Sequence, residues 1–170
     1  MKKKIISLCL AVVLLFVSCY LVSGFFEENY RFPTATTLYS EKNNIIFDSH
    51  SSFDSQKDVF SEIKKLNSSI LHKVSEDFDI HVYGVNETVD TIYKWYDYEY
   101  CKNRWIFNQS VHVDHELGVF SAYFYMKGLS GKLLILGTGD VIHDKLHKQS
   151  VIIILEAPLW VFNDYKETYL

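Results

Sequence analysis

The sequence contains few cysteines, and their positions exclude an internal disulfide in most of the chain. Two of the three, Cys9 and Cys19, lie in an apolar N-terminal segment, so the remaining sequence has only Cys101. A single cysteine cannot form an intramolecular bridge, and the ordinary expectation for it is a small buried side chain near the end of a strand. Folds that depend on internal disulfides are therefore excluded.

Motifs of the common enzyme classes are also missing. The chain has no G-x-S-x-G nucleophile elbow and no Walker loop. Residues 137–140 (GTGD) lack the third glycine and the parallel βαβ unit of a dinucleotide site. The stretch HDKLH at 143–147 lacks the glutamate that follows the first histidine in HExxH metalloproteases. These absences favour a protein that is not an enzyme.

Basic residues are scarce beyond the N-terminus. Residues 27–170 carry 14 basic side chains (17 less three N-terminal lysines) against 21 acidic ones, a formal charge of −7. Such a surface repels phosphate backbones, so nucleic acid is not an expected partner. An apolar share of 48% excludes disorder, and the length predicts one compact domain.

A long apolar run without charges begins the chain. Three lysines, Lys2 to Lys4, precede the uncharged residues 5–26, and Glu27 follows them. This run is long enough to cross a hydrocarbon core of about 30 Å as a helix. Because positive charge stays on the cytoplasmic side, the sequence predicts a membrane protein with a cytoplasmic N-terminus and an extracytoplasmic domain, residues 27–170.

Three fates of residues 1–26 stay open. The segment can remain uncut as a signal anchor, or a peptidase can cut after Gly24, where Val22 and Gly24 supply the small residues of the site. The third fate is lipidation of Cys19, because residues 16–19 (FVSC) resemble a lipoprotein box. The first and third keep the protein attached to the membrane.

The rest of the chain divides into a tether, 27–52, and one domain, 53–170. Apolar residues recur every three or four positions over 55–75, which predicts an amphipathic helix. After Asp77 the period changes to two and predicts strands over 80–85, 91–101, 104–113, 117–126, 132–136 and 151–155. Their short connections suit hairpins, so we expect an α+β fold with the helix packed on an antiparallel meander of five to six strands. This order resembles the general layout of cystatin-like and NTF2-like domains, many of which are exported accessory or binding modules.

Two polar clusters contain candidate zinc ligands. His112, Asp114 and His115 lie at a proposed turn between two strands, and His143 and His147 lie one turn apart on a predicted short helix over 141–149. Together they could form a zinc site, and no other cofactor is expected. Surface polar residues, with Asp140 as a helix N-cap, are the simpler interpretation.

Aromatic residues are concentrated in two of the proposed strands. If part of the series is exposed, it would form a binding face for a protein, peptide or sugar. The residues are Tyr93, Trp95, Tyr96, Tyr98, Tyr100 and Trp105.

Three hypotheses of function follow. The first is a membrane-tethered, non-catalytic binding or accessory module whose partner is another protein or a peptide. The second is a metal-dependent hydrolase that uses both histidine clusters. The third is a carrier with an apolar pocket between the helix over 55–75 and the sheet.

Overall fold

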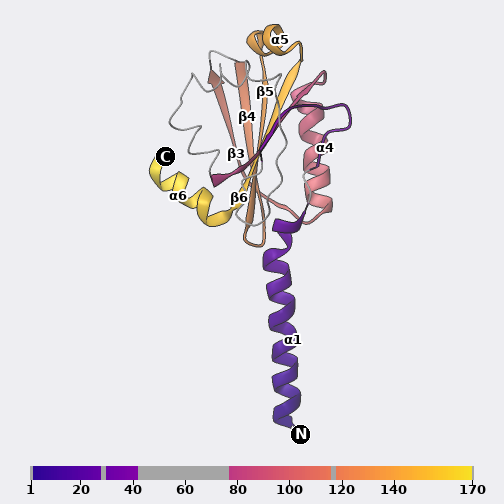
Figure 1. Cartoon of the computed structure of the whole chain (residues 1–170), viewed down its shortest axis with the longest axis vertical. Coiled ribbons are helices and arrows are strands. Elements are labelled where there is room, and N and C mark those ends of the chain that lie inside the picture. Colours follow the sequence, from indigo (N-terminus) through magenta and orange to yellow (C-terminus); the bar gives the residue numbers. More distant parts are fainter. Residues whose placement is uncertain (1, 28–29, 42–76, 116–117, 170) are drawn as a thin grey trace.

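The structure is a computed structural model that describes residues 2–27, 30–41, 77–115 and 118–169 (Figure 1). Its centre is a six-stranded sheet in which every neighbouring pair is antiparallel, in the order β1-β2-β6-β5-β4-β3. The prediction of an α+β fold with an antiparallel sheet is thereby confirmed. The strands are β1 (Thr36–Glu41), β2 (Asp79–Val85), β3 (Ile106–His115), β4 (Gly118–Lys127), β5 (Ser130–Thr138) and β6 (Ser150–Pro158).

Helices lie on both faces of the sheet and at both of its ends (Figure 1). The N-terminal helix α1 (Lys2–Val22) continues into the 3-10 turn η1 (Ser23–Phe26) and projects away from the sheet. Helix α4 (Val89–Lys102) covers one face, α6 (Leu159–Tyr169) packs on the other, and α5 (Asp140–Leu146) caps the end farthest from α1. The side chains of α1 are described from Val12 onward, and within the described residues no helix is long and apolar enough for a membrane span.

Helix α4 overturns the strand predicted over 91–101. Its buried side chains Ile92, Tyr96 and Tyr100 are spaced by four, which is the period of a helix face. The Thr88 side chain caps the first turn by accepting a hydrogen bond from the Thr91 N–H at 3.3 Å. The alternation of Tyr and Trp that indicated a strand is incidental, because tertiary packing of this stripe outweighs the β propensity of aromatic residues.

The helix also changes the topology from the predicted meander. The chain leaves β2, crosses one face as α4 and enters the sheet again at β3, with three strands between β2 and β3. The strands β3, β4, β5 and β6 follow one another as neighbours, with α5 inserted before β6, and β1 pairs with β2 at the other side of the sheet. The short helix predicted over 141–149 is thus present as α5, although its N-cap is Gly139 and not Asp140.

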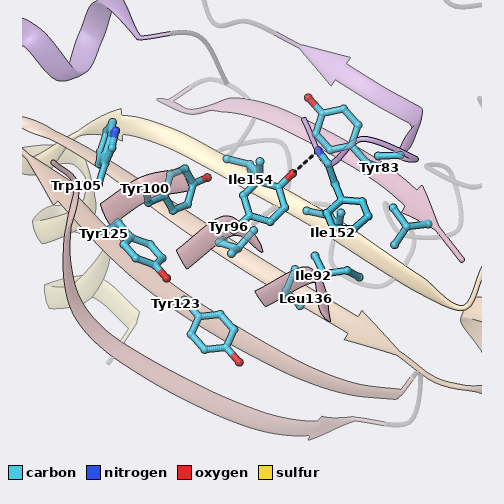
Figure 2. Packing of buried hydrophobic residues seen from close by; sticks show 14 residues of the cluster. Tyr83, Ile92, Tyr96, Tyr100, Trp105, Tyr123, Tyr125, Leu136, Ile152 and Ile154 are labelled. Carbon is cyan, nitrogen blue, oxygen red and sulfur yellow. Dashed lines mark hydrogen bonds between the residues drawn. The ribbon is translucent and has the colours of Figure 1, made fainter. Parts of the chain in front are cut away.

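Two apolar layers bury the two faces of the sheet. The larger layer lies between the sheet and α4 and holds most of the fully buried side chains (Figure 2). The Phe32 N–H donates to the Tyr96 hydroxyl there at 3.3 Å, which ties the segment before β1 to α4. On the other face, Phe162 of α6 packs against Phe124 and Phe78 with ring centroids 4.8 and 4.9 Å apart.

Residues 30–41, which the sequence pattern assigns to a tether over 27–52, pack with the sheet in the structure. Phe32 and Ala35 are buried in the larger layer, and residues 36–41 form β1 on the edge of the sheet. The amphipathic helix predicted over 55–75, and the carrier pocket expected beneath it, lie outside the described residues.

The hydroxyl of Tyr100 gives a test of the larger layer. It is buried with no hydrogen-bond partner among the residues that the structure describes, and burial raises the pKa of Tyr100 well above its ordinary value. Tyr100→Phe should therefore leave the free energy of unfolding unchanged or raise it by up to about 1 kcal/mol. Urea denaturation at pH 7 measures this change.

Tyr125→Phe is the matched control, because the Tyr125 hydroxyl donates to the Asp97 carboxylate at 3.0 Å. Losing a bond to a charged acceptor should cost about 1.5 to 3 kcal/mol. Equal losses in the two variants would contradict this description of the layer.

Candidate functional site

The most distinctive site is the place where α1 meets the sheet, here called the basal junction. It comprises residues 21–27 and the β4–β5 turn, residues 127–130. The Leu129 N–H donates to the Leu21 carbonyl at 2.9 Å, so the turn satisfies one of the carbonyls that a helix end leaves without an intrahelical partner. The helix is therefore joined to the domain by its backbone and not only by chain connectivity.

Two glycines allow this close approach. A Cβ at Gly128, where φ is +59°, would lie 2.3 Å from the Leu21 carbonyl oxygen. A Cβ at Gly24 would lie 2.7 Å from both the Lys127 carbonyl oxygen and the Ser130 Cβ. Any other residue at either position would push α1 away from the turn.

Glu27 carries the charge of the junction. Its carboxylate pairs with the Lys127 ammonium and accepts a hydrogen bond from the Trp105 indole N–H at 2.5 Å. Lys127 also donates to the Asn103 carbonyl oxygen at 2.9 Å. Trp105 and Lys127 are both buried, and burial, with the positive charge of Lys132 second, lowers the pKa of Lys127.

Behind the junction lies a buried lysine in an aromatic cage. Lys132 is 0% exposed, and its ammonium lies 4.8 Å from the Trp105 ring centroid and 5.9 Å from those of Tyr30 and Tyr100. Its cross-strand neighbour Glu156 provides a carboxylate oxygen at 2.5 Å. Burial lowers the pKa of Lys132, and the Glu156 carboxylate opposes this effect. Ring faces and a carboxylate together replace the water that the ammonium has lost.

Exposed apolar side chains surround the junction on its outer side. Phe26 is 76% exposed and Trp160, at the start of α6, is 54% exposed, while Phe25 and Leu129 are each 39% exposed. The rings of Phe25 and Trp160 are 6.4 Å apart, and the Leu159 N–H donates to the Leu129 carbonyl at 2.8 Å. These four residues, Phe25, Phe26, Leu129 and Trp160, are called the basal patch.

The apolar surface continues from the basal patch along α1. The exposed large apolar side chains of this helix are Val12, Val13, Leu14, Leu15, Phe16, Val17, Tyr20 and Val22. Cys19 is exposed on the same helix. Monomeric soluble domains rarely expose apolar surface of this extent.

The histidine clusters do not form a metal site in the described part of the chain. On β3, His112 Nδ1 lies 2.7 Å from the Ser121 hydroxyl and Asp114 is exposed, whereas the His115 side chain is outside the described set. His143 and His147 are exposed on α5 and at its end. Among the described side chains, no group of three or more His, Cys, Asp or Glu could hold a metal ion.

The aromatic series is divided between the core and the surface. Tyr96, Tyr100 and Trp105 are buried in the larger layer, and Tyr93 and Trp95 are half-buried against it. Only Tyr98 is exposed, with the Lys102 ammonium 5.8 Å from its ring centroid. Because the predicted strand is a helix, these residues form no continuous face, and most of them stabilise the core.

Cys101 also differs from the expectation of a buried side chain. It is exposed on α4, with its thiol 3.9 Å from the Asp97 carboxylate. Desolvation first, and then Asp97, raise its pKa, which disfavours the thiolate and hence a nucleophilic role.

Among the residues that the structure describes, β3 forms an exposed edge of the sheet, which the sequence did not predict. Residues 106–114 are all exposed, and they include the apolar side chains Ile106, Phe107, Val111 and Val113. The segment contains none of the lysines and prolines that usually protect an edge strand. The position of this strand at the edge could not be read from local pattern.

Comparisons of the chain with protein-family models, with curated proteins and with solved structures found no match.

Proposed function

We propose that the protein is a membrane-tethered, extracytoplasmic binding module without catalytic activity. The observation that carries the proposal is the basal junction, where a helix with an exposed apolar surface is packed onto a charged and hydrogen-bonded base. Water is a poor solvent for such a helix, and a bilayer is a good one. The lysines at its start and the formal charge of −7 beyond it support a cytoplasmic N-terminus and an exported domain.

The junction also favours a particular processing of the N-terminus. Cleavage after Gly24 would remove the Leu21 carbonyl and the Gly24 backbone that the β4–β5 turn contacts. An uncut helix keeps both, and so does a lipoprotein that begins at Cys19. The proposal therefore retains the signal anchor and the lipoprotein, both attached to the membrane, and sets aside free secretion.

The binding surface in this proposal is the β3 edge, and the partner is an extended segment of another protein. Unpaired backbone groups on an edge strand can hydrogen-bond an added strand, and alternate side chains then select its sequence. Val111 and Val113 lie on one face of β3 and would contact alternate side chains of that segment. The absence of a zinc site among the described side chains leaves the hydrolase without support.

Cys101 allows a direct test of sidedness. It is the only cysteine after residue 26 and is exposed, while Cys9 and Cys19 lie in the segment proposed to be in lipid. In intact cells that produce the full chain, a membrane-impermeant maleimide should modify the protein at pH 8, although slowly because the thiol pKa is raised. Cys101→Ser should abolish the modification. Failure to label an abundant, membrane-bound chain would refute an extracytoplasmic domain.

A further inference from the structure

We infer that the basal patch lies in the interfacial layer of the bilayer, so that the domain stands on the membrane surface beside α1. This inference rests on the proposed function in its signal-anchor form, because it requires the uncut helix α1 to cross the membrane. It adds that residues of the folded domain, far from α1 in the sequence, also contact lipid. The partner of this surface is therefore the headgroup region of a bilayer.

The length of the helix sets the depth of the patch. If the hydrocarbon core begins after Lys4, about 20 residues at 1.5 Å each cross its thickness of about 30 Å, which places Gly24 at the far boundary. Gly24 is buried against the Lys127 carbonyl and Ser130, so the β4–β5 turn lies at that same boundary. The interfacial layer is about 5 to 7 Å thick on each side, and Phe26 lies only about 3 to 4 Å beyond Gly24.

The chemistry of the patch suits that layer. Trp is enriched where bilayer and water meet, because its ring is apolar and its N–H is polar, and Trp160 is the only exposed tryptophan among the described residues. Phe25 lies beside Trp160, and Leu129 is part of the turn. These two side chains and the exposed Phe26 would each remove apolar area from water. The nearest buried charges, Lys127 and Glu27, neutralise each other.

The arrangement fixes how the domain stands on the membrane. The turn between β4 and β5 faces the lipid, and α5 lies at the opposite end of the sheet, farthest from the membrane (Figure 1). The β3 edge then runs from the base outward, where a partner can reach it. A flexible tether would not fix this orientation, whereas the packed glycines and the Glu27 pair do.

Lipid-specific quenching of Trp160 tests the inference. The full chain is reconstituted into phosphatidylcholine vesicles whose lipids carry bromine near the headgroup end of the acyl chains. A Trp160→Phe variant is treated in the same way and keeps a ring beside Phe25. Since Trp105 is buried and Trp95 is half-buried, the difference in emission between the two proteins isolates Trp160. We expect brominated lipid to abolish most of this difference and aqueous iodide to leave it unchanged.

Flotation of the same vesicles separates the two proposals. If the protein does not float with the lipid, the membrane-tether proposal fails and this inference fails with it. If it floats but iodide quenches Trp160 and brominated lipid does not, only the inference about the patch is refuted. If neither agent quenches Trp160, protein and not lipid covers the patch, which also refutes lipid contact.

Discussion

Replacing Lys132 with Met should lower the free energy of unfolding by about 3 to 5 kcal/mol, although methionine fills much of the same volume. The reason is the Glu156 carboxylate, which loses the ammonium 2.5 Å away and remains largely buried. An ion pair of this kind contributes little compared with a well-packed apolar pair, but removal of one partner leaves an uncompensated charge. Guanidinium denaturation of the full chain in detergent measures the loss.

A double variant separates the charge from the packing. Lys132→Met combined with Glu156→Leu should recover most of the loss, because the carboxylate that lost the ammonium is then gone as well. Lys94→Met is the matched control, since its pair with Asp90 has a similar distance of 2.6 Å but both side chains are 72% exposed. That change should stay within about 0.5 kcal/mol. If the double variant loses as much free energy of unfolding as Lys132→Met, the loss comes from the change in side-chain volume and not from an unpaired charge.

The lowered pKa of Lys132 also predicts the direction in which the stability of the protein changes with pH. Because burial lowers the pKa of Lys132, the folded protein releases this proton at a lower pH than the unfolded chain does. Between that lowered pKa and the ordinary value of 10.5, the unfolded state binds more protons, so this group makes the protein more stable as pH rises. The Lys132→Met variant should lack this component.

Glu27→Ala should have the second largest effect, a loss of about 2 to 3 kcal/mol. It removes the partner of the Lys127 ammonium and the acceptor of the Trp105 N–H, and both groups are buried. The effect is smaller than for Lys132 because the Glu27 side chain is 22% exposed. Glu27→Gln should fall between Glu27→Ala and the wild type, because an amide oxygen can still accept from Trp105.

A double variant tests whether the unpaired ammonium of Lys127 causes this loss of stability. Glu27→Ala with Lys127→Met should be more stable than Glu27→Ala alone, since the ammonium that lost its partner is gone. Thermal unfolding of the full chain, followed by the near-ultraviolet signal of the tryptophans, compares the variants. If Glu27→Ala melts like the wild type, the junction is not part of the folded domain and α1 is only a flexible appendage.

Most strands of the sheet could be predicted from the sequence, because the pattern of apolar residues along a strand can be read from neighbouring positions. In β5, Leu134 and Leu136 alternate with residues of the opposite face, and β4 alternates as regularly, whereas β6 contains a continuous apolar run, Val151 to Leu155. The predicted positions of these three strands therefore agree with the structure within a few residues. Helix α4 was missed because its tyrosines alternate over a short stretch. The better signal was the spacing of Ile92, Tyr96 and Tyr100 after the Thr88 cap.

The basal junction could be predicted only in part. The apolar run of α1 is plain in the sequence, as is the carboxylate that follows it. The lysine that pairs with Glu27 lies 100 residues later, and no local pattern selects it. Lys132 shares its parity with Leu134 and Leu136, but the rings of its aromatic cage come from residue 30 and from residues 100–105, which no local pattern places beside it.

The most direct test of the account is the rate at which an impermeant maleimide modifies Cys101 before and after the membrane is permeabilised. The account places the domain, and with it this exposed thiol, outside the cytoplasm, held there by α1. It predicts equal rates in intact and permeabilised cells, with the modified chain in the membrane fraction. Modification only after permeabilisation, or a modified chain that is free of membranes, would contradict it.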